Sequence, residues 1–308
     1  MKYKLSTIHL LLLIQLTLCF HGPLNYNDQS HWPDLCPIGT HQSPINLPLQ
    51  NECIQSSNYF SFKQINYTSL NNKHLEYVNE YTFQLDTSDN GYIEVDIHNK
   101  TYKYKIDNIH FHLNSEHTFN NKLFSSEMHL VHILDPSLQS TSTEEEYEYN
   151  KYLVIGIIFE PKEGNTINPF FQELNFNSLS NVNNLKWDFF LNDNSNYYYY
   201  HGSLTTPTCA EQVNWIIIDN IYPISHEQFN SFKTHIGKTY PQGNNRHIQN
   251  QNGRNIYYII HSKDKSTTAL YIISIIILTI TILYVMLWCY YNNKHKSSSL
   301  NEEPNIYI

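Results

Sequence analysis

The sequence lacks any cluster of lysine and arginine: its 308 residues include 19 of these basic side chains against 28 acidic ones. The formal net charge of -9 argues against nucleic acid as a partner, because phosphate contacts require concentrated positive charge. Internal repeats and stretches rich in proline, glycine and serine are also missing between residues 21 and 262. This part of the chain is therefore predicted to fold as a single domain.

Long apolar runs are rare, and the two that occur lie near the ends of the chain. The run from Ile8 to Leu18 follows Lys2 and Lys4 and is too short to cross a bilayer. A basic start, a short apolar stretch and small residues near its end are typical of a secretory signal peptide. Residues 1–20 are therefore predicted to be removed from the mature protein.

The second apolar run, Ala269 to Tyr291, carries no charged side chain and is long enough to cross a hydrocarbon core of about 30 Å as a helix. A buried core helix and a glycolipid-anchor signal are the alternatives. Such a signal ends on its apolar stretch, whereas polar residues continue to Ile308 here. The run predicts a transmembrane helix over 269–291, with a short linker over 263–268 and a cytoplasmic tail over 292–308.

The five cysteines agree with a secreted domain. Cys19 lies in the predicted signal peptide and Cys289 in the predicted transmembrane helix. Cys36, Cys53 and Cys209 therefore remain in a compartment that allows disulfides. Because three is an odd number, one thiol is free or paired between chains, and the residue spacing does not say which.

Two N-glycosylation sequons occur within the predicted domain, Asn66-Tyr67-Thr68 and Asn99-Lys100-Thr101. Glycans are predicted on Asn66 and Asn99, since both sequons agree with secretion. Together with the two apolar runs, they predict a single-pass membrane protein whose folded domain is extracellular or lumenal.

Alternating patterns rich in β-branched and aromatic residues dominate the domain, whereas helical patterns are few and short. Extended strands are predicted over four segments: Tyr92–His98, Tyr102–Leu113, Glu127–Leu134 and Tyr152–Phe159. Short helices are predicted over Asn168–Leu174 and Ser225–Lys233, the second capped by Ser225 with Gln228 three residues later. The acidic stretch Ser140–Glu148 is predicted to be a solvated loop.

Histidines are abundant, with 17 in the chain, so only their arrangement can identify a site. His110 and His112 are two residues apart in a predicted strand and therefore project from the same face. A second predicted strand carries His129, and antiparallel pairing of the two strands would place this ring beside the first pair. Three neutral imidazoles with an open fourth position are typical of a catalytic zinc site, although a His-x-His pair alone is weak evidence.

Several ordered motifs are shared with a known family. They are Gln42–Asn46, His110–Thr118, Glu127–His132, Ser203–Pro207 with Val213–Trp215, and Asn244–Arg246 continuing to Gly253 and Arg254. Together these segments resemble the alpha-class carbonic anhydrases, in the right order, over about residues 24–256.

The resemblance implies an α+β fold, mainly β, with a large twisted and mostly antiparallel sheet, short peripheral helices and zinc at the bottom of a conical cavity. It implies a zinc lyase that reversibly hydrates carbon dioxide to bicarbonate and a proton. His110, His112 and His129 would hold Zn²⁺, whose bound water, with its pKa lowered to about 7, would attack carbon dioxide as hydroxide. Thr205 would accept a hydrogen bond from this hydroxide and donate its own proton to Glu116.

The resemblance also implies an outer layer of partners that fix the imidazole tautomers. Glu127 shares the face of His129 and would accept from its second nitrogen. Asn108 would do the same for His110, although the family usually has the longer glutamine at this position. His117 is expected in the same outer layer.

An apolar pocket should receive the small apolar substrate. By resemblance its wall comprises Val131, Val154, Leu204, Thr206, Val213 and Trp215, although core packing alone would also explain each apolar side chain. Tyr81 stands where the family often has a histidine that shuttles protons. Because the pKa of tyrosine is near 10, we expect a slower enzyme assisted by buffer or by a rim histidine such as His74.

Two departures concern the segment after Thr205. Thr208 replaces a second proline that often follows a cis peptide in the family, so the local backbone is expected to differ here. Cys209 falls where secreted members have a cysteine bonded to one near the position of Cys36. The resemblance therefore favours a Cys36–Cys209 disulfide, which would help to hold the catalytic loop.

The alternative to an enzyme is a catalytically inactive surface binding or adhesion module on the same fold, as when members of this family lose a zinc ligand. Retention of all three histidines together with Glu116 and Thr205 favours the enzyme. A protease-type zinc hydrolase is disfavoured because the sequence contains no His-Glu-x-x-His motif. Protein partners are not predicted.

Overall fold

A computed structural model describes residues 24–55, 59–78, 82–138, 143–164, 166–177, 181–191, 195–260 and 265–299. The chain forms two compact units, residues 1–260 and 261–308, which are considered separately. The predicted signal peptide over residues 1–20 lies outside the described residues.

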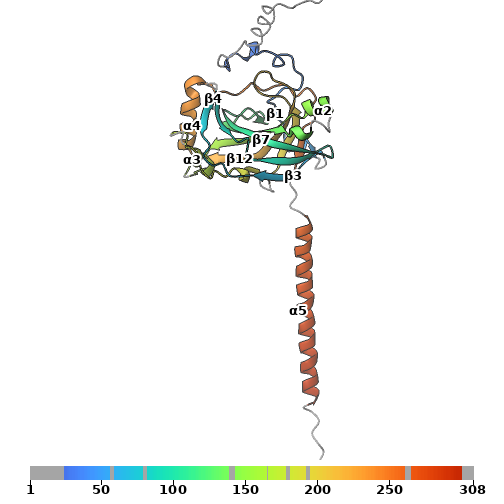
Figure 1. The fold of residues 1–308 in the computed structure, drawn as a ribbon. Helices are drawn as coiled ribbons and strands as arrows, with labels where there is room; N and C mark the ends of the chain where they lie inside the picture. The colour runs from blue at the N-terminus through green and yellow to red at the C-terminus, as the bar shows by residue number, and fades with distance from the viewer. Residues whose placement is uncertain are drawn as a thin grey trace, which may run out of the picture. The chain divides into compact units, whose positions relative to one another are not determined.

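The first unit is built on one large sheet of eleven strands among the described residues (Figure 1). Its main path runs through β2 (Ile54–Gln55), β13 (Tyr257–Ile259), β11 (Tyr197–Gly202), β12 (Val213–Ile224), β10 (Tyr152–Pro161), β9 (Ser126–Leu134), β7 (Lys100–Leu113), β5 (Thr82–Asp86) and β4 (Leu75–Val78). Strand β6 (Gly91–Ile97) pairs with β7 and with β3 (Phe60–Tyr67). Two short strands, β1 (Asn46–Leu47) and β8 (Thr118–Phe119), form a separate parallel pair.

Most pairings in the large sheet are antiparallel, and the parallel exceptions among the described strands are β10 with β12 and β13 with β2. All four predicted strands are present, as β6, β7, β9 and β10. The predicted mainly β fold with a large, mostly antiparallel sheet is therefore confirmed.

The helices in the described part of this unit are short. They are α2 (Glu144–Tyr149), α3 (Pro169–Leu174), α4 (His226–Thr239) and the 3-10 turns η1 (Gln29–His31), η2 (Gln50–Glu52), η3 (Pro136–Leu138) and η4 (Asp188–Leu191). Both predicted helices are confirmed: Asn168 caps α3, and Ser225 with Gln228 forms the predicted capping box of α4. Helix α4 continues beyond the predicted end because Phe232 and Ile236, four residues apart, bury one face of it.

The prediction of a loop over the acidic stretch was wrong for Glu144 to Glu148, which belong to α2. The side chain of Thr143 accepts a hydrogen bond from the Glu146 amide and so caps the helix. Three glutamates in the first turn also interact favourably with the positive end of the helix dipole. Residues 140–142 lie outside the described part of the chain.

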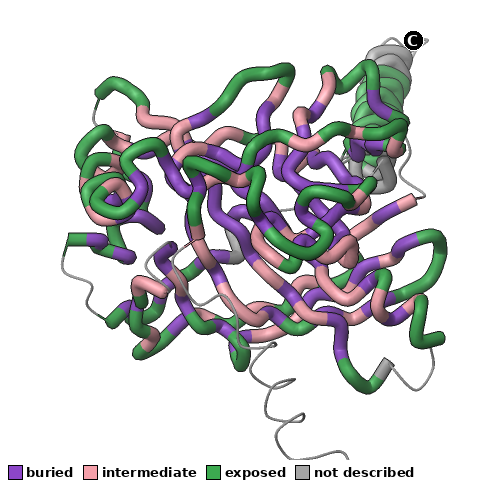
Figure 2. The backbone as a smooth tube through the Cα atoms, turned by 90° about the horizontal axis from the view of Figure 1, so that it is seen from above, coloured by how far each residue is buried: buried purple, intermediate pink, exposed green. Residues whose placement is uncertain are grey.

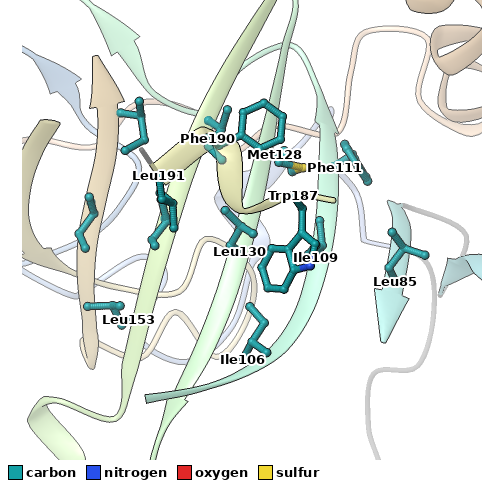
Figure 3. Close-up of a cluster of buried hydrophobic side chains, with 14 of the residues drawn as sticks. Leu85, Ile106, Ile109, Phe111, Met128, Leu130, Leu153, Trp187, Phe190 and Leu191 are labelled. Carbon is teal, nitrogen blue, oxygen red and sulfur yellow. The ribbon is translucent and has the colours of Figure 1, made fainter. Parts of the chain in front are cut away.

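The strands alternate between two faces, and this alternation separates the core from the histidines. Ile109 and Phe111 of β7 lie in the large hydrophobic core with Leu130, Trp187 and other apolar side chains (Figure 3). The intervening residues of β7 project to the opposite face. Figure 2 shows that buried residues concentrate toward the middle of the domain, whereas exposed residues predominate at its periphery.

The second unit contains α5 (Lys265–Ser299). Within it, Tyr271–Asn292 is long and apolar enough to cross a membrane, and its apolar side chains are exposed. The helix is longer than the predicted span of 269–291: it begins inside the predicted linker and continues into the predicted tail.

Candidate metal centre

The pairing of β7 with β9 brings three histidines together. Its antiparallel register sets His110 directly opposite His129, and His112 follows two residues further along β7. One nitrogen from each ring lies within 4.8 Å of the other two. This convergence requires both the two-residue period of β7 and the antiparallel neighbour, the two features read from the sequence.

Each ring donates its outer N–H group to a fixed acceptor. The acceptors are Asn108 Oδ1 for His110 (2.9 Å), the Asn244 carbonyl for His112 (3.0 Å) and Glu127 Oε1 for His129 (2.9 Å). In a neutral imidazole the other nitrogen then carries a lone pair. The inner atoms are therefore Nε2 of His110, Nε2 of His112 and Nδ1 of His129, all of them acceptors.

These inner lone pairs lack a donor. Nε2 of His110 lies 3.2 Å from Nδ1 of His129, and Nε2 of His112 is buried with no hydrogen-bond partner. Burial holds the pKa of His110 well below its usual value and also lowers that of His112. Both rings therefore stay neutral at neutral pH, and protonation of their inner nitrogens does not supply the missing donors. Three nitrogen acceptors that face one another, on the buried rings of His112 and His129 and the half-buried ring of His110, fit a cation such as Zn²⁺, which prefers imidazole ligands.

Asn108 reaches His110 despite being shorter than the glutamine usual in the family. Its Nδ2 donates to Asp107 Oδ2 at 2.7 Å, which turns its oxygen toward the histidine ring. The shorter side chain therefore still fixes the tautomer of His110.

Glu127 organises the inner end of β9. Its Oε1 accepts from His129 and from His117 Nδ1 at 2.8 Å, while its Oε2 accepts the backbone amides of Glu116 and His117 at 2.9 and 2.8 Å. Burial raises the pKa of Glu127, but the charge and hydrogen bonds of His117 and His129 outweigh it and hold this pKa well below its usual value. His117 lies in turn 2.7 Å from the Tyr200 hydroxyl.

Glu116 is fully buried beside the histidines. Its Oε1 accepts the Arg246 amide at 2.9 Å, and its Oε2 lies 4.0 Å from His129 Nδ1 without any hydrogen-bond partner. The predicted hydrogen bond from Thr205 to Glu116 is therefore not formed in this structure. Oε1 is occupied by the Arg246 amide, and Oε2 is left without a donor.

The proposed wall residues come from three neighbouring strands and the segment after β11. Val131 of β9 pairs with Val154 of β10, which pairs with Trp215 of β12. The wider set shares one hydrophobic cluster, in which Val154, Val213 and Trp215 are buried and Val131 and Leu204 partly buried. The Trp215 ring centre lies 4.9 Å from that of His129, so this cluster adjoins the histidines. Thr206 is half-buried.

The segment after Thr205 is tied to the N-terminal part of the domain by a disulfide between Cys36 and Cys209, 173 residues apart. Cys53 is a free, buried thiol, and burial raises its pKa to about 11. The expectation that the backbone differs at Thr208 was wrong: the Pro207–Thr208 peptide is cis, as is common at this point in the family.

The remaining candidate residues are those predicted to shuttle protons or to carry glycans. Tyr81 falls outside the described residues. His74 is exposed and hydrogen-bonds to Asn181 at 3.1 Å. Asn66 and Asn99 are both exposed.

Sequence reasoning missed the roles of Asn244 and Arg246. Both lie in a quoted motif, but Asn244 is 132 residues from His112 and Arg246 is 130 residues from Glu116. Asn108 and Glu127 are local partners, so face parity along one strand supports the role that the resemblance implies for them. It carries no signal for contacts made by a distant segment.

The fold and the histidine cluster define a class of protein in which a large mixed sheet carries three histidines that could hold a metal ion. The model of the family described as eukaryotic-type carbonic anhydrase matches residues 27–260. The chain belongs to this carbonic anhydrase family, and the resemblance read from the sequence is confirmed. Membership supports carbon dioxide hydration as its general class of reaction.

Individual relatives agree. A carbonic anhydrase of Pectobacterium atrosepticum is 28% identical over 244 residues, covering 76% of this chain and 87% of the bacterial protein. Human carbonic anhydrase 7 is 28% identical over 230 residues, covering 67% of this chain and 81% of the human one. The solved alpha-carbonic anhydrase of Thermovibrio ammonificans, in complex with the inhibitor sulfanilamide, is 26% identical with a TM-score of 0.53, covering 72% of this chain and 89% of that one.

Proposed function

We propose that this chain hydrates carbon dioxide reversibly to bicarbonate and a proton at a zinc ion held by His110, His112 and His129. The observation that carries the proposal is the convergence of three imidazole lone pairs, each fixed by a partner on the outer side of its ring. A zinc ion with three such ligands and one open position acidifies a water molecule, so that it becomes a nucleophile near neutral pH.

The chain's own residues supply orientation. Asn108, Glu127 and the Asn244 carbonyl hold the three rings in the tautomers that present lone pairs inward. Glu116 Oε2 is a buried acceptor without a donor. Because a buried acceptor normally finds a donor, we assign the Thr205 hydroxyl as the donor to this oxygen in the working enzyme, where the Thr205 oxygen would also accept a hydrogen bond from the attacking nucleophile.

The hydrophobic cluster beside His129 is proposed to receive carbon dioxide. Val131, Val154 and Trp215 form a continuous apolar strip across three paired strands. A linear apolar substrate gains little from polar contacts, so such a strip suits it better than a polar wall does.

The domain is proposed to work outside the cytoplasm, anchored by α5. The apolar span Tyr271–Asn292, the Cys36–Cys209 disulfide and the exposed sequon residues Asn66 and Asn99 support this placement. The cleaved signal peptide over 1–20 and the cytoplasmic tail over 292–308 belong to the same proposal.

Stopped-flow measurement of carbon dioxide hydration by the full chain in detergent, with zinc content determined on the same sample, tests the function. The variant His112→Ala should lose both bound zinc and activity, whereas the exposed control His74→Ala should keep its zinc. Full hydration activity in His112→Ala, or a folded wild-type chain that takes up no zinc, would refute the proposal.

A further inference from the structure

A cavity of about 500 Å³ is lined by none of the residues assigned to the metal centre. Its lining comes from the β6–β7 turn, helix α2, strand β11 and residues 253–257. This volume lies within the range of sites for small organic ligands. The reaction proposed above makes no use of it.

Two stacked aromatic pairs form flat walls of the cavity. The rings of Tyr59 and Tyr257 stack with centres 3.7 Å apart, and those of Tyr149 and His201 stack at the same distance with planes only 4° apart. Tyr149 is nevertheless 52% exposed, because only one of its faces is covered by the histidine. The cavity therefore offers rigid aromatic faces to a ligand.

Polar groups of both signs complete the lining. The Glu146 carboxylate accepts from Lys100 Nζ and from the Tyr102 hydroxyl, so these two opposite charges are balanced. The Arg254 guanidinium donates to backbone carbonyls and packs over the Tyr200 ring. A ligand with a flat C–H face and hydroxyl groups around its edge matches this set, and a pyranose sugar has that form.

One sequon residue sits at the edge of this cavity. Asn99 is exposed in the two-residue turn between β6 and β7, and the residues on either side of it, His98 and Lys100, both line the cavity. The His98 amide donates to the Tyr59 carbonyl at 3.0 Å, and their rings are in contact at 3.7 Å. The turn that carries Asn99 is thus fixed to an aromatic wall.

We propose that this cavity seats the first sugars of an N-linked glycan carried by Asn99. The inference rests on the extracytoplasmic placement proposed above. There a lipid-linked oligosaccharide donates its sugar: Asn99 Nδ2 bonds to the anomeric carbon, the lipid diphosphate leaves and the amide loses a proton. The N-acetylglucosamine ring then packs on Tyr149, and its hydroxyls reach Lys100 and Glu146. A weak contact suffices because the tether gives an effective concentration in the millimolar range.

The test compares sequon variants in three backgrounds, which are the wild type, Tyr149→Phe and Tyr149→Ala. The full chain is produced in a glycosylating host and purified in detergent. Glycan occupancy is read by mass spectrometry of the sequon peptides and stability by the unfolding temperature. Asn99→Gln should lower Tm by about 2–4 °C. This loss should persist in Tyr149→Phe, which keeps the ring, and disappear in Tyr149→Ala. Asn66→Gln, the matched control away from the cavity, should give the same shift in all three.

Three results overturn the inference. They are an Asn99→Gln shift that is equal in all backgrounds, a glycan on Asn66 with none on Asn99, and no glycan on either residue. The last result would also contradict the proposed extracytoplasmic placement of the domain, whereas the zinc chemistry is tested separately by the carbon dioxide hydration assay.

A free sugar distinguishes recognition from a passive effect of the tether. N,N′-diacetylchitobiose at millimolar concentration should raise the Tm of Asn99→Gln but not that of the double variant Asn99→Gln with Tyr149→Ala. Equal responses of the two proteins would contradict sugar recognition by this cavity.

Discussion

Because Gly156 has no side chain, the Glu127 carboxylate has space to accept the hydrogen bond from His129. Gly156→Ala should therefore weaken zinc binding although it changes none of the proposed zinc ligands. Gly156 pairs with His129 across β9 and β10. A β-carbon at this position would lie 2.7 Å from Glu127 Oε1 and 2.7 Å from Ile217 Cδ1. Ordinary contacts between such atoms are about 3.5 Å, so the carboxylate must move by roughly 0.8 Å.

That displacement stretches the 2.9 Å bond between Glu127 and His129 beyond good hydrogen-bonding distance. Loss of such an outer partner raises the Kd for zinc about 10- to 100-fold, equivalent to about 1.4–2.7 kcal/mol. Overpacking should also lower the free energy of unfolding of the zinc-free protein by about 1–3 kcal/mol.

Zinc affinity is measured by competition with a chelator, and stability by thermal unfolding after zinc removal, because bound metal would itself raise Tm. Gly237→Ala is the matched control: its β-carbon would meet only Lys233 Cγ at 3.9 Å, and it lies in α4, where alanine is favourable. Wild-type zinc affinity in Gly156→Ala would refute the assigned role of Glu127.

Three further predictions follow from the same structure. Thr205→Ala should reduce the hydration rate by about 10²-fold with zinc content unchanged, while Thr205→Ser keeps most activity; equal rates in stopped-flow assays would exclude the hydroxyl from catalysis. Burial lowers the pKa of His132 in the folded protein to about 4, from the ordinary value of 6.5 that the unfolded chain keeps. As pH falls, the unfolded chain therefore takes up a proton on this histidine first, and the free energy of unfolding should drop by about 3 kcal/mol between pH 6.5 and 4. Urea unfolding of His132→Gln should not show this decrease in the free energy of unfolding. A pH profile of stability equal to that of the wild type would contradict the prediction. Cys36→Ser with Cys209→Ser should lower the free energy of unfolding by about 2–5 kcal/mol, and an unchanged denaturation midpoint would contradict a stabilising disulfide.

The histidine pattern could be read from the sequence because its determinants are local. The two-residue period of β7 fixes which side chains share a face, and the same parity agrees with the partner roles of Asn108 and Glu127 that the family resemblance implied. The starts of α3 and α4 were equally readable, since Asn168 and Ser225 cap within one turn.

Long-range and borderline features could not be read in the same way. The Asn244 carbonyl reaches His112 only after the whole sheet has formed, and backbone carbonyls have no residue signature. The acidic composition of α2 concealed a helix whose first turn is favoured by its cap and dipole. The orientation of Glu116 is set by the backbone amide of Arg246, which every residue except proline offers.

The contacts that Asn244 and Arg246 make with His112 and Glu116 limit when this site can form during synthesis. These residues lie near the C-terminal end of the domain yet hold His112 and Glu116, which are translated at least 130 residues earlier. The nascent chain therefore cannot close the centre until the ribosome has passed Arg246, shortly before the apolar span is made. A metal ion held by the three histidines in this geometry would therefore be captured only after residue 246 has been made.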